Sequence, residues 1–409
     1  MRYVIIGASA GALAAAEILR QWDRDGSITL ISEEPHRPYS RPLLTYLLSG
    51  EVKPEQIWLR PEDYWEKWGF QALLGEPVVQ VDPQAHAVHL AGGRACPYDR
   101  LFIASGAEAR RPDLPGQDLT GVYTLRLLKD WQRLDEELPK SGAVAVVGAG
   151  PVGLKATEAL VKRGLKVILL EAEARAMPHL LDESAAAFLH QALLDLGVEL
   201  NFKSRPTKVL GDQGRVRGLA LADGREVAVQ AVLFAIGVTP RTDFLAGTGL
   251  AGPAGIQVDE FMQTAHPDIY AAGDCARPRH LLTGEPASYQ IWPAAVAQGQ
   301  VAGANLAGAR RRYDGLLPQN SLSLGDLKII SGGLLNPPED QGEVITQYEP
   351  RQGLYRRLVL HQDRLVGVTL IGNITDAGIY FQLLAQRLPV HQLTTDPRAP
   401  DFHPGRLWG

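Results

Sequence analysis

The chain has 409 residues, which is more than one ordinary hydrophobic core accommodates, so two or three domains are expected. A hydrophobic share of 45% and a charged share of 21% are typical of a globular protein, and no apolar run approaches the length of a membrane span. The net charge of −5 argues against nucleic acid as a partner, because phosphate binding needs a concentrated basic surface.

Residues 2–34 predict a strand, a glycine turn, a helix and a second strand. The turn, Gly7-Ala8-Ser9-Ala10-Gly11-Ala12, is a degraded form of the G-x-G-x-x-G spacing of dinucleotide-binding units. Ala12 still allows tight helix packing, and the Ser9 hydroxyl can donate to a pyrophosphate. Glu33 and Glu34 follow the second strand, and one of them is the ribose candidate. Because the strand begins at residue 2, we expect no signal peptide and a cytoplasmic protein.

The stretch Val144–Glu171 predicts a second unit of the same kind with an intact fingerprint, Gly148-Ala149-Gly150-Pro151-Val152-Gly153. The glycines allow a tight turn, a pyrophosphate against bare backbone, and close packing of helix on strand. The helix N-terminus then offers unpaired N–H groups to the phosphates. Glu171 ends the second strand, where a carboxylate accepts ribose hydroxyls and repels a 2′-phosphate. The nearest downstream arginine is Arg175, so we expect NAD.

Two further segments indicate an internal duplication. Leu101–Gly106 and Val232–Gly237 are both apolar strands that end at a glycine, Gly106 and Gly237, and each closes its own unit. In the second half, strands are expected near 206–210, 216–221 and 226–232. Two complete units favour two bound dinucleotides over one dinucleotide and a duplicated scaffold.

The remaining elements follow in order. Asp268–Asp274 is an apolar strand ending in Gly273-Asp274, and a carboxylate there suits a ribose or polyol hydroxyl. Pro293–Ala307 predicts a helix, with Trp292 before it. Ser323–Gln386 predicts a strand-rich module with a final helix over 375–386, and Thr394–Gly409 predicts an arm.

These motifs, in this order, resemble those of the two-dinucleotide-binding-domain flavoproteins, the pyridine nucleotide–disulfide oxidoreductase superfamily, over nearly the whole chain. The resemblance implies an α/β fold with two Rossmann-like three-layer domains, for FAD and NAD, and a small C-terminal α+β domain for an interface or dimerisation. The expected ranges are 1–112 with 246–318 for FAD, 113–245 for NAD, and 319–409 for the C-terminal domain.

The resemblance also assigns roles to residues. Gly7–Ala12, Ser105, Gly106, Gly273 and Asp274 match FAD-binding positions, and Gly148–Gly153 matches the NAD turn. The segment Pro38-Tyr39-Ser40-Arg41-Pro42-Leu43-Leu44 resembles the Y-D-R-P-P-L segment of ferredoxin and rubredoxin reductases, and of the flavin part of NADH-dependent nitrite reductases. It implies that Arg41 and Pro42 contact FAD. Trp292 resembles the tryptophan beside the flavin, although a core aromatic is the alternative.

The cysteines depart from the family pattern. The disulfide reductases and the peroxidase and oxidase branch carry one or two cysteines after the first unit, whereas residues 1–95 here contain none. Because a thiolate is the nucleophile in those reactions, thiol–disulfide and peroxide chemistry are disfavoured. Cys96 and Cys275 are expected to be structural, and the histidines are too scattered for a metal site.

A second departure concerns Tyr46 and Lys155. Many ferredoxin reductases have Lys at the first position and Glu at the second, close to the reactive edge of the flavin. We hypothesise that Lys155 reaches the flavin near N5 and stabilises its reduced anionic form, since a nearby cation favours negative charge. A solvated helix lysine is an equally good interpretation. Lys155, Tyr46 and Trp292 are therefore the candidate catalytic residues.

The resemblance implies an FAD-dependent NADH oxidoreductase that passes electrons to a one-electron iron–sulfur carrier such as rubredoxin or ferredoxin. One alternative is a flavin subunit of a larger NAD-linked iron–sulfur complex, and another is a redox-responsive binding or signalling flavoprotein. A homodimer and a subunit of a hetero-oligomer are both open. No motif identifies the acceptor.

Overall fold

The computed structural model describes residues 1–138, 142–336, 342–397, 399 and 402. It divides into two compact units, each built from segments distant in sequence. Unit 1 comprises Met1–Ser40, Pro54–Glu108 and Val238–Leu316. Unit 2 comprises Arg41–Lys53, Ala109–Gly237 and the described residues of Leu317–Gly409.

Unit 1 contains a five-stranded parallel sheet in the order β20-β7-β1-β2-β3. Its strands are nearly continuous apolar runs, as expected for a parallel sheet covered on both faces. The bounds are β1 Arg2–Ile6, β2 Ser27–Ser32, β3 Phe70–Leu74, β7 Arg100–Ile103 and β20 Ile269–Ala271. The other unit 1 elements are α1 Ala10–Trp22, α3 Tyr64–Trp68, α7 Trp292–Leu306, β4 Val78–Asp82, β5 Ala87–Leu90, β6 Ala95–Pro97, β17 Val238–Pro240, β18 Ala251–Gly252, β19 Gly255–Gln257 and β21 Ala276–Arg277.

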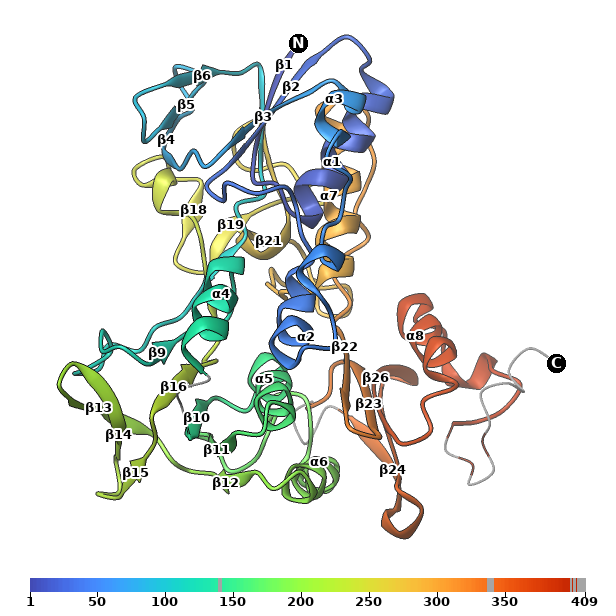
Figure 1. Cartoon of the computed structure of the whole chain (residues 1–409). Coiled ribbons are helices and arrows are strands. Elements are labelled where there is room, and N and C mark those ends of the chain that lie inside the picture. Colours follow the sequence, from blue (N-terminus) through green and yellow to red (C-terminus); the bar gives the residue numbers. More distant parts are fainter. Residues whose placement is uncertain (139–141, 337–341, 398, 400–401, 403–409) are drawn as a thin grey trace. The chain divides into compact units, whose positions relative to one another are not determined.

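Helices α1 and α7 run side by side in unit 1 (Figure 1). Both helices present small residues at the contact, so their backbones approach closely. A Cβ atom added at Gly299 would overlap the carbonyl oxygen of Gly11, and one at Gly303 would overlap that of Ala15. Because the obstacle is backbone in both cases, only glycine fits at these two positions of α7.

Unit 2 contains a second five-stranded parallel sheet, in the order β12-β11-β10-β16-β9. An antiparallel three-stranded sheet, β13-β14-β15, packs its apolar side chains against it. The bounds in this part of unit 2 are α2 Leu44–Ser49, β9 Val122–Tyr123, α4 Leu128–Glu137, β10 Ala143–Val147, α5 Pro151–Lys162, β11 Lys166–Leu170, α6 Glu183–Asp195, β12 Glu199–Asn201, β13 Pro206–Asp212, β14 Arg215–Leu221, β15 Glu226–Ala228 and β16 Ala231–Phe234. Strand β8, Ala107–Ala109, spans the boundary between the units.

The C-terminal part of unit 2 is an antiparallel sheet in the order β22-β23-β26-β25-β24, with helix α8 packed on it. The bounds are β22 Gln319–Leu324, β23 Leu327–Gly333, β24 Glu343–Glu349, β25 Leu354–His361, β26 Arg364–Ile371 and α8 Ala377–Gln386. The strand-rich module and the final helix predicted over 323–386 are confirmed, and the sequence did not predict β22 and β24. The module is thus mostly antiparallel sheet.

Four strands of each parallel sheet repeat one topology, β7-β1-β2-β3 in unit 1 and β16-β10-β11-β12 in unit 2. In unit 1 the Gly7 N–H donates to the Ile31 carbonyl at 2.7 Å, and in unit 2 the Gly148 N–H donates to the Leu170 carbonyl at 2.8 Å. The residue after the closing strand likewise donates to the end of the first strand in each unit. The predicted duplication and the α/β class are therefore confirmed.

Three other expectations concern the domain ranges, the C-terminal arm and membrane-spanning helices. The predicted domain ranges stay a prediction. The two compact units group the C-terminal module and Arg41–Lys53 with the sheet that contains β10. Residues 398, 400–401 and 403–409 of the predicted arm lie outside the described part of the chain. Within the described residues, no helix is long and apolar enough to cross a membrane.

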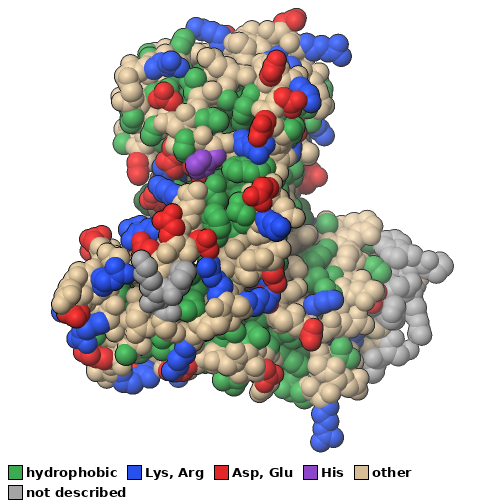
Figure 2. Space-filling view, in the orientation of Figure 1, with side chains coloured by type: hydrophobic (Ala, Val, Ile, Leu, Met, Phe, Trp, Pro, Cys, Tyr) green, Lys and Arg blue, Asp and Glu red, His purple; other side chains and the backbone are tan. Residues whose placement is uncertain are grey.

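Acidic and basic side chains are mixed over the face that Figure 2 shows.

Candidate functional site

The intact glycine turn connects β10 to α5. Gly148 has a φ of +105°, and a Cβ there would lie 2.5 Å from the Ala235 carbonyl oxygen. A Cβ at Gly153 would overlap the Gly148 carbonyl oxygen, so close packing requires glycine at both positions. Gly150 differs, because a Cβ there would meet nothing within 4 Å. Bare backbone therefore borders open space at the N-terminus of α5, which fits a dinucleotide pyrophosphate.

Pro151 and Val152 form the first turn of α5 and are exposed, Val152 to 49%. Proline suits this position because its missing N–H would have no partner inside the helix. The N–H groups of the residues beside it remain directed at the open space. An exposed valine at a helix N-terminus offers an apolar contact to a bound nucleotide.

Glu171 lies beside this turn. Its Oε2 accepts the Ala149 N–H at 2.7 Å and its Oε1 accepts the Glu173 N–H at 3.0 Å. The carboxylate is thus held by backbone, and each oxygen retains a lone pair for a ribose hydroxyl. Arg175 donates to the carbonyl oxygens of Leu181 at 2.9 Å and Pro178 at 3.2 Å. The guanidinium therefore holds its own loop instead of being free to take a 2′-phosphate.

The degraded turn connects β1 to α1 in unit 1. Gly7 has a φ of +116°, and a Cβ there would overlap the Ala104 carbonyl oxygen. Ser9 is the N-cap of α1, and its side chain makes no capping hydrogen bond. Ala10 and Ala12 are buried in the first turns of the helix. The turn thus leaves the Ser9 hydroxyl uncommitted to the helix, as a pyrophosphate contact requires.

The two acids after β2 point to different partners. Glu33 forms a two-pronged ion pair with Arg241, whose two Nη atoms contact both carboxylate oxygens. Glu34 accepts the hydroxyl hydrogen bond of the buried Tyr39 at 2.6 Å. Arg241 was not anticipated from the sequence.

The Gly-Asp motif follows β20. The Gly273 N–H donates to Oε1 of Gln298 at 2.8 Å, so buried Gln298 of α7 fixes the turn that carries Asp274. Ser105 donates to the Arg241 carbonyl at 2.7 Å, and Gly106 accepts the Arg241 N–H at 3.0 Å. Unit 1 therefore brings Gly7–Ala12, Glu33, Ser105, Gly106 and Gly273–Asp274 to the carboxyl edge of one sheet, where nucleotides bind in such folds.

The other predicted residues lie elsewhere. Arg41, Pro42 and Tyr46 belong to unit 2, and Arg41 donates to the Arg126 carbonyl at 3.3 Å. Trp292 is the first residue of α7 in unit 1 and is half-buried. Gly237 has a φ of +98° at the last residue of unit 2 before β17. Their roles toward FAD stay predictions.

Lys155 is not simply a solvated lysine. Its ammonium pairs with Glu158, donates to the Ser323 carbonyl at 3.1 Å, and lies 4.9 Å from the ring centroid of Tyr46. The Glu158 side chain is only 5% exposed and also accepts from Lys162 at 3.1 Å. Burial raises the pKa of Glu158, but the hydrogen bonds from Lys155, the Gly325 N–H and Lys162 outweigh it, so the pKa lies below its ordinary value.

Both cysteines are buried, and burial raises the pKa of each thiol. A raised pKa leaves little thiolate at neutral pH. Among the described residues, no cluster of His, Cys, Asp and Glu could hold a metal ion.

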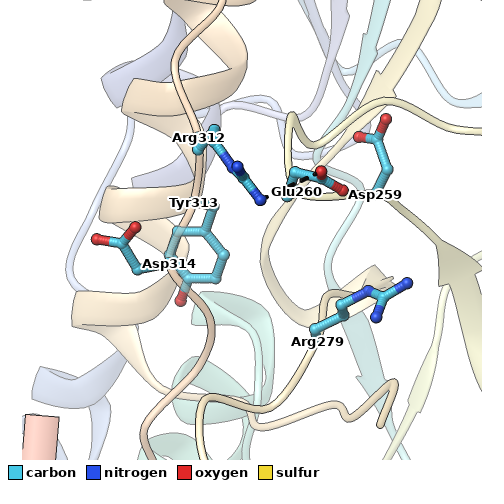
Figure 3. Close-up of a pocket in the computed structure, with 6 residues that line it drawn as sticks. All are labelled: Asp259, Glu260, Arg279, Arg312, Tyr313 and Asp314. Carbon is cyan, nitrogen blue, oxygen red and sulfur yellow. Dashed lines mark hydrogen bonds and ion pairs between the residues drawn. The ribbon is translucent and has the colours of Figure 1, made fainter. Parts of the chain in front are cut away.

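A cavity of about 470 Å³ opens elsewhere in unit 1 (Figure 3). In it Arg312 and Glu260 point toward one another as an ion pair at 3.4 Å, and Asp314 points away. Burial raises the pKa of Tyr313, which hydrogen-bonds to Gln298. None of the predicted residues lines this cavity, whose walls are Asp259, Glu260, Arg279, Arg312, Tyr313 and Asp314.

Comparison with known proteins agrees with this geometry. Residues 1–299 match the model of the family described as pyridine nucleotide-disulphide oxidoreductase. The chain belongs to this family. It is accordingly an oxidoreductase whose cofactors are FAD and NAD(H), and the two glycine turns described above fit them. Residues 318–388 match a second model, the rubredoxin NAD+ reductase C-terminal domain.

Individual relatives cover nearly the whole chain. The NADH-dependent phenylglyoxylate dehydrogenase subunit epsilon of Aromatoleum evansii is 32% identical over 94% of this chain and 92% of its own length. The rhodocoxin reductase of Rhodococcus erythropolis is 33% identical over 95% and 91%. The crystal structure of a ferredoxin reductase for the CYP199A2 system from Rhodopseudomonas palustris superposes with a TM-score of 0.89 and 27% identity, over 99% of this chain and 98% of that one.

Proposed function

We propose that the protein is an FAD-dependent NADH oxidoreductase that passes electrons to a one-electron iron–sulfur carrier of the rubredoxin or ferredoxin type. The observation that carries the proposal is the match of residues 318–388 to the rubredoxin NAD+ reductase C-terminal domain, joined to the family match over residues 1–299. Relatives named rhodocoxin reductase and rubredoxin-NAD(+) reductase support it.

Bound FAD supplies the conversion between the two electrons of NADH and the single electrons of an iron–sulfur centre. The chain supplies binding and orientation. The N-terminus of α5 and the bare backbone at Gly150 hold the pyrophosphate of NADH, and Glu171 accepts its ribose hydroxyls. In unit 1 the turn at Gly7–Ala12 and the motif Gly273–Asp274 hold FAD. The proposed reaction uses no cysteine, and the burial of Cys96 and Cys275 supports this part of the proposal.

Lys155 acts, in this proposal, as a cation that favours the reduced anionic flavin. Its ammonium contacts Glu158 and the Ser323 carbonyl and lies over the ring of Tyr46, so its charge has a defined position within unit 2. The test is Lys155→Met, followed by stopped-flow reduction of the flavin with NADH and by the flavin potential. The control is Lys162→Met, which changes a lysine about two helical turns further along α5. If Lys155→Met leaves the rate of flavin reduction and the flavin potential unchanged, Lys155 does not have this role.

A second candidate is a flavin subunit of a larger NAD-linked iron–sulfur complex in the cytoplasm. It is favoured by the relative named subunit epsilon of an NADH-dependent dehydrogenase, because the aligned region covers 92% of that subunit. Purification from the native source under mild conditions separates the candidates. A stable iron–sulfur partner indicates a subunit, and a lone yellow protein indicates a diffusible reductase.

The acceptor is tested by direct activity measurements. FAD-loaded protein and NADH are mixed with rubredoxin, with ferredoxin, with an artificial one-electron acceptor, and with a disulfide. The proposal expects fast reduction of an iron–sulfur carrier and none of the disulfide. Rapid turnover with a soluble carrier would also exclude a purely signalling flavoprotein.

A further inference from the structure

The β11–α6 loop, residues 171–182, is attached to the intact glycine turn through both backbone groups of Ala149. The Ala149 N–H donates to Oε2 of Glu171 at 2.7 Å, and the Ala149 carbonyl accepts the N–H of Met177 at 3.0 Å. Gly150, whose bare backbone borders open space, is the next residue of the turn. The conformation of the loop and the shape of the nucleotide site are therefore coupled within unit 2.

Met177 gives this loop a conformation that needs support. Its φ is +49°, in the left-handed region that few non-glycine residues adopt. Its carbonyl accepts the N–H groups of Leu180 and Leu181, both at 2.9 Å, and its side chain is buried. A backbone of this kind persists only where the surrounding contacts determine it. The contacts of the residue before Met177 are therefore important for the loop.

His190 of α6 provides the contact at that residue. The N–H of Ala176, which is fully buried, donates to Nε2 of His190 at 3.1 Å. Because a backbone N–H can only donate, Nε2 carries no proton and the neutral ring is protonated at Nδ1. Phe202 lies against the ring, with centroids 4.4 Å apart and planes at 31°, which restricts its orientation. Without this acceptor, the Ala176 N–H would be buried and unpaired, which is costly.

The surroundings of His190 favour the neutral ring. Burial lowers the pKa of His190 below its ordinary value, because the interior disfavours the imidazolium. In the described part of the chain, no charged group forms an ion pair or hydrogen bond with the ring. In the loop, Glu171 and Asp182 accept backbone N–H groups, and Arg175 donates to loop carbonyls. The other titratable side chains of the loop, α6 and the β12 segment are exposed to solvent: Glu173, His179, Glu183, Asp195, Glu199 and Lys203.

We propose that His190 is a positioning residue for NAD(H), whose neutral Nε2 holds the β11–α6 loop against the glycine turn and whose protonation releases the loop. An imidazolium has a proton on both ring nitrogens, so Nε2 would then face the Ala176 N–H as a second donor. Affinity for the nucleotide should therefore be full above about pH 6.5 and fall as the pH decreases through the lowered pKa of the folded protein. The inference depends on NAD(H) as a cofactor and is independent of which electron acceptor the protein serves.

The test titrates the oxidised, FAD-loaded protein with NAD+, which binds without reducing the flavin, and measures affinity by calorimetry. His190→Leu removes the acceptor and keeps an apolar side chain, and we expect it to bind NAD+ about tenfold more weakly. His190→Gln has an amide oxygen that can replace Nε2, and it should stay within about threefold of the wild type. The matched control is Gln191→Leu, which changes an exposed residue of the same helix and should keep wild-type affinity.

The pH dependence separates positioning from support of the fold. Between about pH 7.5 and about pH 5, the wild type should lose at least about threefold more NAD+ affinity than His190→Gln, because glutamine does not titrate. With an artificial one-electron acceptor, His190→Leu should raise KM for NADH and leave kcat nearly unchanged, which is the result of lost binding alone.

Two results would overturn the inference. One is wild-type NAD+ affinity in His190→Leu. The other is an equal loss in His190→Gln and His190→Leu together with the same pH dependence in the wild type and His190→Gln, which indicates support of the fold alone. If His190→Leu does not fold, the pH dependence of the wild type and His190→Gln still decides. A protein that binds NAD+ in this way but reduces no iron–sulfur carrier would refute the proposed function and leave the inference standing.

Discussion

The two dinucleotide units share a topology and differ in how they satisfy the same requirements. In unit 2, backbone groups meet most of these requirements, because Gly153 allows α5 to contact the turn and the Ala149 N–H donates to Glu171. In unit 1, Ala12 stands at the position of the third glycine, and close packing of a helix requires glycine at the contact between α1 and α7 instead. Arg241 there replaces the backbone hold on the acid.

The difference explains why one fingerprint is intact and the other is degraded. A motif built on backbone contacts within a short βαβ unit has little freedom to vary. In unit 1, elements from distant parts of the chain contribute to the packing around the turn, so the glycine spacing of the turn itself can vary. The requirement for glycine is then found in α7, at Gly299 and Gly303.

We expect the largest effect from exchanging the third small residue of each turn, Gly153 in unit 2 and Ala12 in unit 1. Gly153→Ala forces a Cβ into the Gly148 carbonyl oxygen, and we expect unit 2 to lose about 3 kcal/mol of stability and NADH binding with it. The reciprocal change, Ala12→Gly, should cost about 1 kcal/mol, the usual difference in helix propensity. Thermal unfolding and NADH titration check both. Equal effects of the two variants would show that the units pack their turns in the same way.

The α1–α7 contact gives the second largest effect. Gly299→Ala meets the Gly11 backbone, so FAD content should fall and unit 1 should be destabilised by about 1–3 kcal/mol. Gly378→Ala in α8, where an added Cβ meets nothing within 4 Å, is the matched control and should be neutral or stabilising by up to about 1 kcal/mol. Flavin absorbance per mole of purified protein and thermal melting measure the pair. Full FAD content in Gly299→Ala would show that FAD binding does not depend on the contact between α1 and α7.

Nucleotide choice comes next. Glu171→Gln weakens the hydrogen bonds to the ribose and removes the charge that repels a 2′-phosphate. We expect NADH affinity to fall about tenfold and NADPH to bind no more weakly than before. The exposed Glu173→Gln is the control. Equal losses for both nucleotides would mean that Glu171 only shapes the loop.

The smallest effect is a pH dependence from buried Glu158. Its pKa is lowered in the folded state, so its contribution to stability is fully present above the unfolded value of about 4.3 and disappears as the pH falls through the folded value. The melting temperature of the wild type should exceed that of Glu158→Gln at neutral pH, and the gap should close below about pH 4. A gap that is constant down to pH 3 would contradict the sign of the shift.

The sequence predicted the features that are local. Both βαβ units, Glu171, the Gly273–Asp274 turn and most C-terminal strands follow from spacing and apolar periodicity within about 30 residues. It could not predict Arg241, because its partner Glu33 lies 208 positions away and a single arginine in a loop has no periodic context. Gln298 and Glu158 were missed for a related reason: a polar residue in a helix shows its burial only when the packing partners are known.

In the proposed function, NADH electrons leave this protein singly, through FAD, and reach an iron–sulfur carrier without the use of a cysteine. It is tested most directly by steady-state reduction of rubredoxin and ferredoxin by the FAD-loaded Cys96→Ala, Cys275→Ala double variant with NADH. We predict fast carrier reduction by this variant, at a rate within about twofold of the wild type, which is a barrier change of about 0.4 kcal/mol. Loss of carrier reduction in a variant that still binds FAD, or a wild type that reduces disulfides or peroxide but no carrier, would contradict it.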